Sequence, residues 1–191
     1  MSYKNPTVPL ITNPVNLDAA IQDVQVKLAN GLSWLDASFG RAYTGSRKVE
    51  NKDVFYPEVY QGKKEYLDVS PNDNLIAQSF FDLKDPQEFE RMGLYQDGQF
   101  TSNISIIFWM NLDRVKKAGT YTYSHRFTEE LKAQILNVLK LHCPNFILNK
   151  IYEEADEVYR GYTMDHVKQQ TLKHPFAGFR FEGQLIFNEQ C

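Results

Sequence analysis

The sequence predicts an α+β domain in which a mainly antiparallel sheet carries two principal helices packed on one face. Three observations lead to this prediction: two amphipathic stretches, several short β-prone runs rich in aromatic residues, and one continuous apolar run near the middle of the chain. The 191 residues fit one domain, and 42% hydrophobic with 14% aromatic residues supply a packed core. The chain is therefore expected to fold.

Residues 1–16 are expected to form an extended N-terminal arm, because three prolines in this stretch each fix φ and restrict the preceding residue. The single α+β domain is expected to occupy residues 17–191. Its first helix is predicted over 17–30, with Asn16 as N-cap and Gly31 as the residue that stops it.

The region after this helix is typical of short strands separated by turns. Aromatic and β-branched residues predict strands at 39–43, 54–60 and 65–69. Residues 45–53 are charged and contain one large apolar side chain, so they predict a mobile loop. Residues 88–94 are compatible with a single helical turn or a loop.

Continuous apolarity within residues 101–112 predicts a central strand covered on both faces. A second helix is predicted over 128–141, because a capping threonine and two glutamates precede a stripe of apolar residues. A strand is expected within 145–154, and the alternating run 176–187 is expected to close the sheet.

Charge and composition exclude several classes of protein. The chain has 21 Lys and Arg against 24 Asp and Glu, which gives a net charge of −3 and no reason to expect nucleic-acid binding. No apolar window approaches the roughly 18 residues that a membrane helix requires. The two cysteines are too few for a disulfide framework, and their usage indicates free thiols in a cytoplasm.

Established catalytic motifs are absent from the sequence, so no catalytic residue, cofactor site or metal site is assigned. His166 and His174 are interpreted as ordinary surface or core histidines. His142 and Cys143 are neighbours on a helix and point in different directions, which argues against a nucleophile and base. The acidic group within 153–157 is interpreted as a solvated face.

Aromatic residues near turns and strand ends predict a protein interface, since tyrosine serves both at the edge of a core and in contacts between subunits. Residues 119–126 resemble a polar edge strand or an ordered loop, and an edge strand needs a guard or a neighbouring subunit. The predicted interface residues are Arg41, Tyr43, Arg47, Lys48, Tyr56, Tyr60, Tyr121 and Tyr123.

The order of elements resembles that of the small α+β tail-terminator, or tail-completion, proteins of tailed phages and prophages. The features that carry the resemblance are the early amphipathic helix, the apolar strand 104–109, the capped helix 128–141 and the closing strand 179–187. The resemblance implies a structural protein without catalysis. It implies a homo-oligomeric ring, commonly a hexamer, that caps the tail tube and joins it to the head.

The resemblance further implies contacts with tail-tube and head–tail connector proteins, and a location in the host cytoplasm and then in the virion. Two alternatives stay open. One is another assembly component, such as a head–tail adaptor or a baseplate protein. The other is a cytoplasmic enzyme or small-ligand-binding domain whose site consists of residues dispersed along the sequence.

Overall fold

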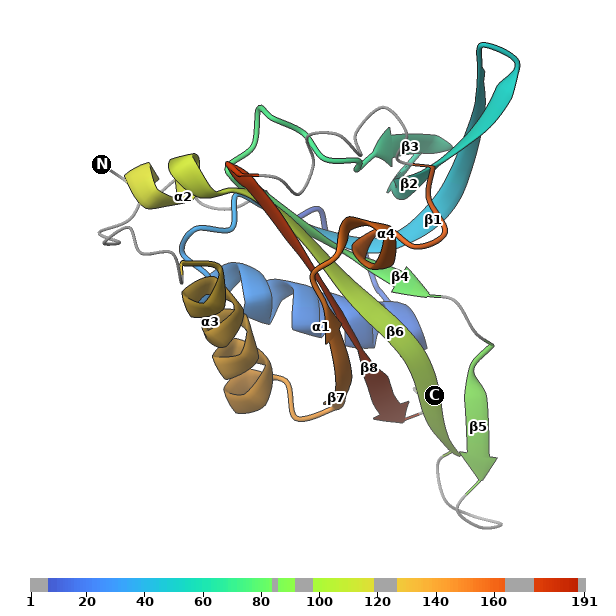
Figure 1. Ribbon diagram of the computed structural model, residues 1–191. Coiled ribbons are helices and arrows are strands. Elements are labelled where there is room, and N and C mark those ends of the chain that lie inside the picture. Colours follow the sequence, from blue (N-terminus) through green and yellow to red (C-terminus); the bar gives the residue numbers. More distant parts are fainter. Residues whose placement is uncertain (1–6, 84–85, 92–97, 119–126, 164–173, 189–191) are drawn as a thin grey trace.

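The computed structural model describes residues 7–83, 86–91, 98–118, 127–163 and 174–188. These residues form an eight-stranded sheet with helices on both faces (Figure 1), which confirms the α+β class. The elements are α1 (Asn16–Gly31), β1 (Ala37–Val49), β2 (Lys52–Gly62), β3 (Glu65–Asp68), β4 (Ala77–Leu83), β5 (Glu88–Arg91), β6 (Gly98–Asn111), α2 (Leu112–Ala118), α3 (Phe127–His142), β7 (Phe146–Tyr152), α4 (Ala155–Val158) and β8 (Phe176–Asn188).

The sheet has the strand order β3-β2-β1-β4-β6-β8-β7, and β5 pairs with β6 outside this path. Strands β1 and β4 are parallel, whereas the other paired strands are antiparallel. The prediction that 176–187 closes the sheet is wrong, because β8 lies between β6 and β7. Side chains of β8 are buried along most of its length, as expected for an interior strand.

Strand β6 confirms the prediction of a central strand covered on both faces. Ile106 and Phe108 belong to the apolar cluster that includes the helices α1 and α3. The alternating residues Ile107 and Trp109 belong to a second cluster on the opposite face, which includes Val158 of α4. The period of two along a strand thus explains how one apolar run supplies two cores.

Helices α1 and α3 confirm the two predicted helices and lie on the same face of the sheet (Figure 1). Their buried stripes include Leu28 in α1 and Ile135 in α3, both fully buried. Trp34 follows α1 and donates a hydrogen bond from Nε1 to Oε1 of Gln134 in α3 at 2.9 Å. This bond ties the two helices across the same core.

The predicted ends of the first helix need two corrections. The helix begins at Asn16, which has a φ of 49°, and its N-cap is Val15, without a side-chain cap bond. Gly31 is the last helical residue and lacks a positive φ. A Cβ at Gly31 would lie 2.7 Å from Cγ2 of Val138, so glycine allows α1 and α3 to approach closely.

The predicted loop at 45–53 is instead the end of a β-hairpin. Strands β1 and β2 pair up to Val49 and Lys52, and the figure shows the hairpin extending away from the body (Figure 1). The two connecting residues, Glu50 and Asn51, have φ values of 49° and 63°, as in a two-residue type I′ turn. The two strands stay paired through their charged residues as far as Val49 and Lys52, so backbone pairing forms a hairpin where the composition predicted a loop. Of the helical turn or loop predicted at 88–94, residues 88–91 form the strand β5 instead, and residues 92–94 lie outside the described residues.

The described part of the N-terminal arm, residues 7–15, lies against the body. Thr7 forms a parallel bridge with Ala37 at the start of β1. The amide of Ile11 donates to Oε1 of Gln22 at 2.8 Å, and Nε2 of Gln25 donates to the carbonyl of Pro9 at 3.1 Å. The arm is therefore hydrogen-bonded both to the sheet and to α1.

Candidate functional site

Strands β1, β2 and β3 bring three of the predicted interface residues together on one surface. The guanidinium of Arg41 lies 5.1 Å from the ring centroid of Tyr43. Tyr66 lies opposite Tyr60 in the register, and its ring centroid is 5.2 Å from that of Tyr60 and 6.2 Å from that of Tyr43. These three tyrosines are 41–53% exposed. We call Arg41, Tyr43, Tyr60 and Tyr66 the aromatic patch.

Tyr66 was not predicted as an interface residue. The turn Lys63-Lys64 joins β2 and β3 beside the pair Gly62 and Glu65, and a register shift between Tyr60 and Gly62 then brings Tyr66 opposite Tyr60. The two lysines have φ values of 52° and 66°, again in the left-handed region. The turn indicates a hairpin and so places Tyr66 near the end of β2, but the irregularity that pairs it with Tyr60 leaves no signal in the sequence.

Arg47 and Tyr56 form a second contact farther along the hairpin. The guanidinium of Arg47 lies 4.8 Å from the ring centroid of Tyr56 and 3.4 Å from Oδ2 of Asp68. Gly45 leaves room for this ring, since a Cβ there would lie 2.8 Å from Cζ of Tyr56. Lys48 alternates with Arg47 and faces the other side. Two further predicted interface residues, Tyr121 and Tyr123, lie outside the described residues, as does the whole predicted edge strand 119–126.

A groove of about 590 Å³ adjoins the aromatic patch, between the arm, the first turns of α1 and the base of the hairpin. Arg41, Tyr43 and Tyr60 line it together with Ile11 and Asp18. Nε of Arg41 is buried and has no hydrogen-bond partner among the described residues. A cation beside aromatic rings can bind an apolar side chain that is accompanied by a carboxylate.

A buried ionic network occupies the other face of the sheet. Asp82, Ser105 and Glu182 lie side by side on β4, β6 and β8. The fully buried Arg180 donates from Nη2 to Oδ2 of Asp82, and its Nε lies 3.5 Å from Oε1 of Glu182. The hydroxyl of Tyr162 donates to Oδ1 of Asp82 at 3.0 Å. Buried charges need such pairing, because leaving water is costly for each of them.

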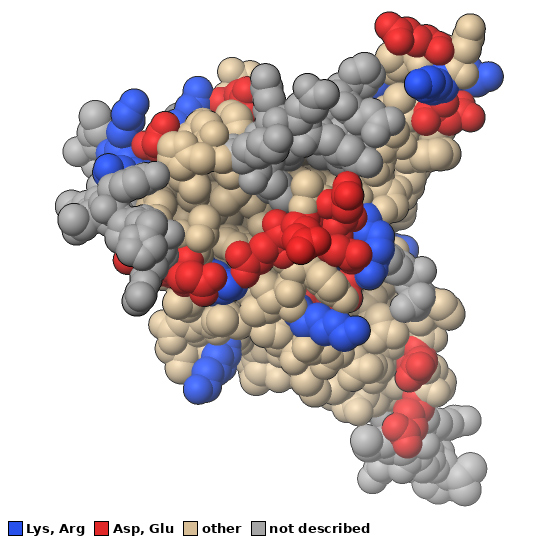
Figure 2. All heavy atoms as spheres, viewed as in Figure 1, with Lys and Arg blue, Asp and Glu red and all other residues tan. Residues whose placement is uncertain are grey.

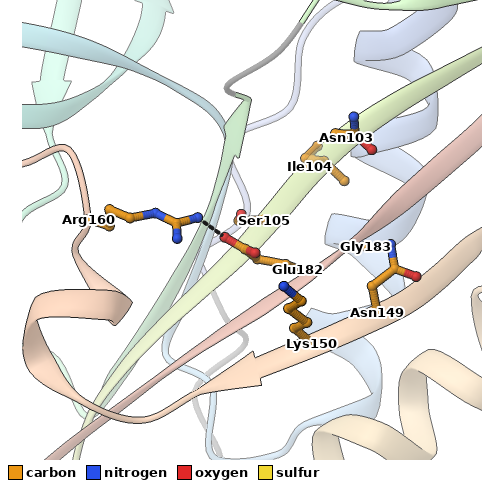
Figure 3. Close-up of a pocket in the computed structure, with 8 residues that line it drawn as sticks. All are labelled: Asn103, Ile104, Ser105, Asn149, Lys150, Arg160, Glu182 and Gly183. Atoms are coloured by element: carbon orange, nitrogen blue, oxygen red, sulfur yellow. Dashed lines mark hydrogen bonds and ion pairs between the residues drawn. The ribbon is translucent and has the colours of Figure 1, made fainter.

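This network opens on a polar cavity of about 260 Å³ (Figure 3). In the wall of this cavity, Nη2 of Arg160 donates a hydrogen bond of 2.6 Å to Oε1 of Glu182. Lys150, Ser105 and Asn149 also line the cavity, and Figure 3 shows Lys150 extending toward Glu182. A carboxylate, an ammonium group and neutral polar groups around one space can hold a small polar molecule.

Sequence reasoning missed this polar site for a physical reason. Asp82 and Arg180 are 98 positions apart and meet only through the pairing of β4 and β8 with β6. The available signal was a charged residue within each apolar strand, since a charge in a buried strand requires a partner. Which charge pairs with which depends on the sheet order.

Two tyrosines beside the network have perturbed acidity. Burial raises the pKa of Tyr159, which is fully enclosed in the second core. Burial also raises the pKa of Tyr162, and the negative charge of Asp82 raises it further. Both hydroxyls therefore stay protonated at neutral pH, and Tyr162 acts as a hydrogen-bond donor to Asp82.

The other residues considered for chemistry lie apart from these sites. Cys143 is buried in the first core, and burial raises the pKa of its thiol to about 11. His174 is exposed, whereas His166 lies outside the described residues. The acidic group 153–157 flanks and forms α4, and Figure 2 shows acidic side chains in a band over that element. Part of this group is paired, because Glu153 accepts from Lys132.

Within the described ranges, no group of three or more His, Cys, Asp or Glu side chains could hold a metal ion. In the same ranges, none of the helices has the length and apolarity needed to cross a bilayer. Comparison with known proteins finds no family model and no curated protein that matches the chain. The aromatic patch and the polar cavity are therefore the features of the described residues that bear on function.

Proposed function

We propose that the protein is a structural subunit of tailed-phage virion assembly, of the tail-terminator or tail-completion type. In this proposal, copies of the chain form a ring that caps the tail tube and joins it to the head. The observation that supports it best is the aromatic patch at the base of a hairpin that extends from the body (Figure 1). Clustered exposed aromatic residues with an arginine are typical of protein interfaces.

The architecture suits this role. A ring requires heterologous contacts, in which one surface of a subunit meets a different surface of the next. A rigid sheet with both faces covered can present such surfaces at fixed positions, and the hairpin extends the reach of one of them. A head–tail adaptor or a baseplate component would use the same surfaces in another part of the virion.

The test is the oligomeric state of the purified chain. We expect light scattering after size-exclusion chromatography to give a defined multimer, and negative-stain images to show rings. Replacing Tyr43 and Tyr66 by serine removes exposed aromatic area and should shift the multimer toward monomer. A chain that stays monomeric up to millimolar concentration contradicts the self-assembly part of this proposal.

The polar cavity favours a second candidate, a small-ligand-binding domain or an enzyme. Its supporting observation is the convergence of Glu182, Lys150 and Arg160 on one space (Figure 3). A thermal-shift screen of small polar metabolites tests it. We expect a stabilising compound to lose its effect in Glu182→Gln, whereas a screen without any stabilising compound counts against this candidate.

A further inference from the structure

Strand β5 presents an unusual exposed surface. Phe89 is 51% exposed and lies between Glu88 and Glu90, which are exposed as well. Figure 2 shows acidic side chains at the position that β5 occupies in Figure 1. Among the described residues, neither glutamate has an ion pair. The strand therefore offers an aromatic ring on one face and, on the other face, two glutamates that lack an ion pair among the described residues.

The groove beside the aromatic patch has the complementary character. Its cation, Arg41, lacks an ion pair among the described residues, and the ring of Tyr43 lies beside its guanidinium, while Tyr60 also lines the groove. Asp18 also lines the groove, but it lies in the first turn of α1, where the positive end of the helix offsets its charge. A volume of about 590 Å³ accommodates an aromatic side chain with its neighbours.

We infer that β5 of one copy inserts edge-on into the groove of a second copy, so that Phe89 on one face of the strand meets Tyr43 and Tyr60 and a glutamate on the other face pairs with Arg41. This inference rests on the proposed function and names the contact that would build the ring. Groove and strand share no residues, so the contact is head-to-tail and propagates until it closes. An arginine–carboxylate pair next to stacked aromatic rings is the kind of contact that dominates interface energy.

Position on the strand supports the docking of Phe89. Strand β5 has four residues, and among the described strands it pairs with β6 alone, where Phe89 lies opposite Phe100. The ring centroids of Phe89 and Phe100 are 4.7 Å apart, and Phe100 stacks on Phe187 at 5.4 Å. Phe89 is thus held from one side by a row of rings, which limits the entropy it loses on docking.

The experiment uses two variants of the full chain, each defective in one partner of the contact. Arg41→Glu changes the groove, and Phe89→Ala changes β5. We expect each variant alone to assemble at least about tenfold more weakly than the unaltered chain, as loss of a charged hydrogen bond or an aromatic anchor implies. Mixed in equal amounts, they retain one intact pair of surfaces and should form a 1:1 heterodimer in sedimentation velocity.

Matched controls separate this contact from general effects. Lys140→Glu reverses an exposed charge on α3, and Leu141→Ala removes an exposed apolar side chain beside it. Both should assemble as the unaltered chain does. Because Arg41 is partly buried, Tyr60→Ser serves as a second groove variant, and circular dichroism checks that each variant is folded.

The outcomes distinguish this inference from the proposed function. Rings that form equally well in Arg41→Glu, Tyr60→Ser and Phe89→Ala overturn the inference and leave the ring proposal standing. A strictly monomeric unaltered chain overturns both. Open filaments that depend on Arg41 and Phe89 support the inference and contradict the closed ring.

Discussion

Asp82 and Arg180 form the most deeply buried ion pair among the described residues, and Arg180 is fully buried. We predict that Asp82→Ala destabilises the fold by about 3–5 kcal/mol, because the buried guanidinium loses the carboxylate that Nη2 contacts and keeps only Glu182, 3.5 Å from Nε, as a counter-charge. The measurement is the free energy of unfolding from urea titration. Asp82→Ala with Arg180→Met should cost less than Asp82→Ala alone, since no buried charge then lacks its partner.

The matched control is an exposed pair. Asp23 and Lys27 lie one turn apart on α1, with Nζ 2.6 Å from Oδ2. Asp23→Asn should cost no more than about 0.5 kcal/mol, since solvent screens such pairs. Equal losses in Asp82→Ala and Asp23→Asn would contradict the account of a buried network.

Cys143 has a pKa of about 11 because of its burial, with Lys27 lowering it and Asp23 raising it to smaller extents. We predict that its thiol resists a disulfide reagent at pH 8 in the folded protein and reacts in urea. The measurement uses a Cys191→Ser background, in which Cys143 is the remaining thiol. Rapid reaction without denaturant would contradict this burial.

The same pKa predicts how this thiol affects stability. The unfolded thiol loses its proton near pH 9, whereas the folded thiol keeps it until about pH 11. Above pH 9 the folded state therefore binds more protons, and the contribution of this thiol to stability falls as the pH rises. Cys143→Ala should reduce the slope of stability against pH between 9 and 11.

At the scale of elements, the contact between α1 and α3 depends on Gly31. Alanine at this position would favour the helix by about 1 kcal/mol in isolation. Its Cβ, however, would lie 2.7 Å from the stiff β-branched side chain of Val138. We predict that Gly31→Ala destabilises the protein by about 1–3 kcal/mol, measured by urea unfolding.

A double-variant cycle tests this explanation. Val138→Ala removes the methyl groups that the new Cβ would meet, so Gly31→Ala should cost much less in the Val138→Ala background. Additive losses would show that Gly31 matters for a reason other than its approach to Val138.

The hairpin turn includes Glu50, a residue type that rarely adopts positive φ. Glu50 and Asn51 both have left-handed backbone angles, and Asn-Gly fits such a turn better. We predict that Glu50→Asn combined with Asn51→Gly stabilises the protein by about 1 kcal/mol, which corresponds to a Tm increase of about 2–4 °C. A lower Tm in calorimetry would contradict the type I′ assignment.

These elements also show what sequence patterns can and cannot predict. The apolar run of β6 and the stripes of α1 and α3 were predictable, because burial imposes a period that composition reveals. The hairpin end was missed, because its strands pair outside the core and carry charged side chains. Its turn also lacks glycine, the usual signal.

The candidate sites were predictable to different degrees. Arg41, Tyr43 and Tyr60 were predicted as interface residues, and they meet because neighbouring strands carry them. The role of these residues as an interface stays a prediction. The groove itself was not predictable, since it forms where the arm is hydrogen-bonded to Gln22 and Gln25 of α1. Contacts between distant segments depend on the fold and leave no pattern along the chain.

At the scale of the whole molecule, the two apolar clusters share the strand β6 and cover opposite faces of one sheet. Because both clusters pack on β6, loss of that strand would disrupt both of them. The described residues are therefore expected to unfold cooperatively, in one transition. The chain contains two tryptophans, and one lies in each cluster: Trp34 in the first and Trp109 in the second.

Single-tryptophan variants test this cooperativity directly. In Trp109→Phe the fluorescence reports on the helix-covered core, and in Trp34→Phe it reports on the opposite core, where Trp109 stacks on Phe176 at 5.5 Å. Within each variant we predict that fluorescence and far-ultraviolet circular dichroism give the same urea midpoint. Separate midpoints would mean that one face melts while the sheet persists, because only then could a tryptophan become exposed before the strands are lost.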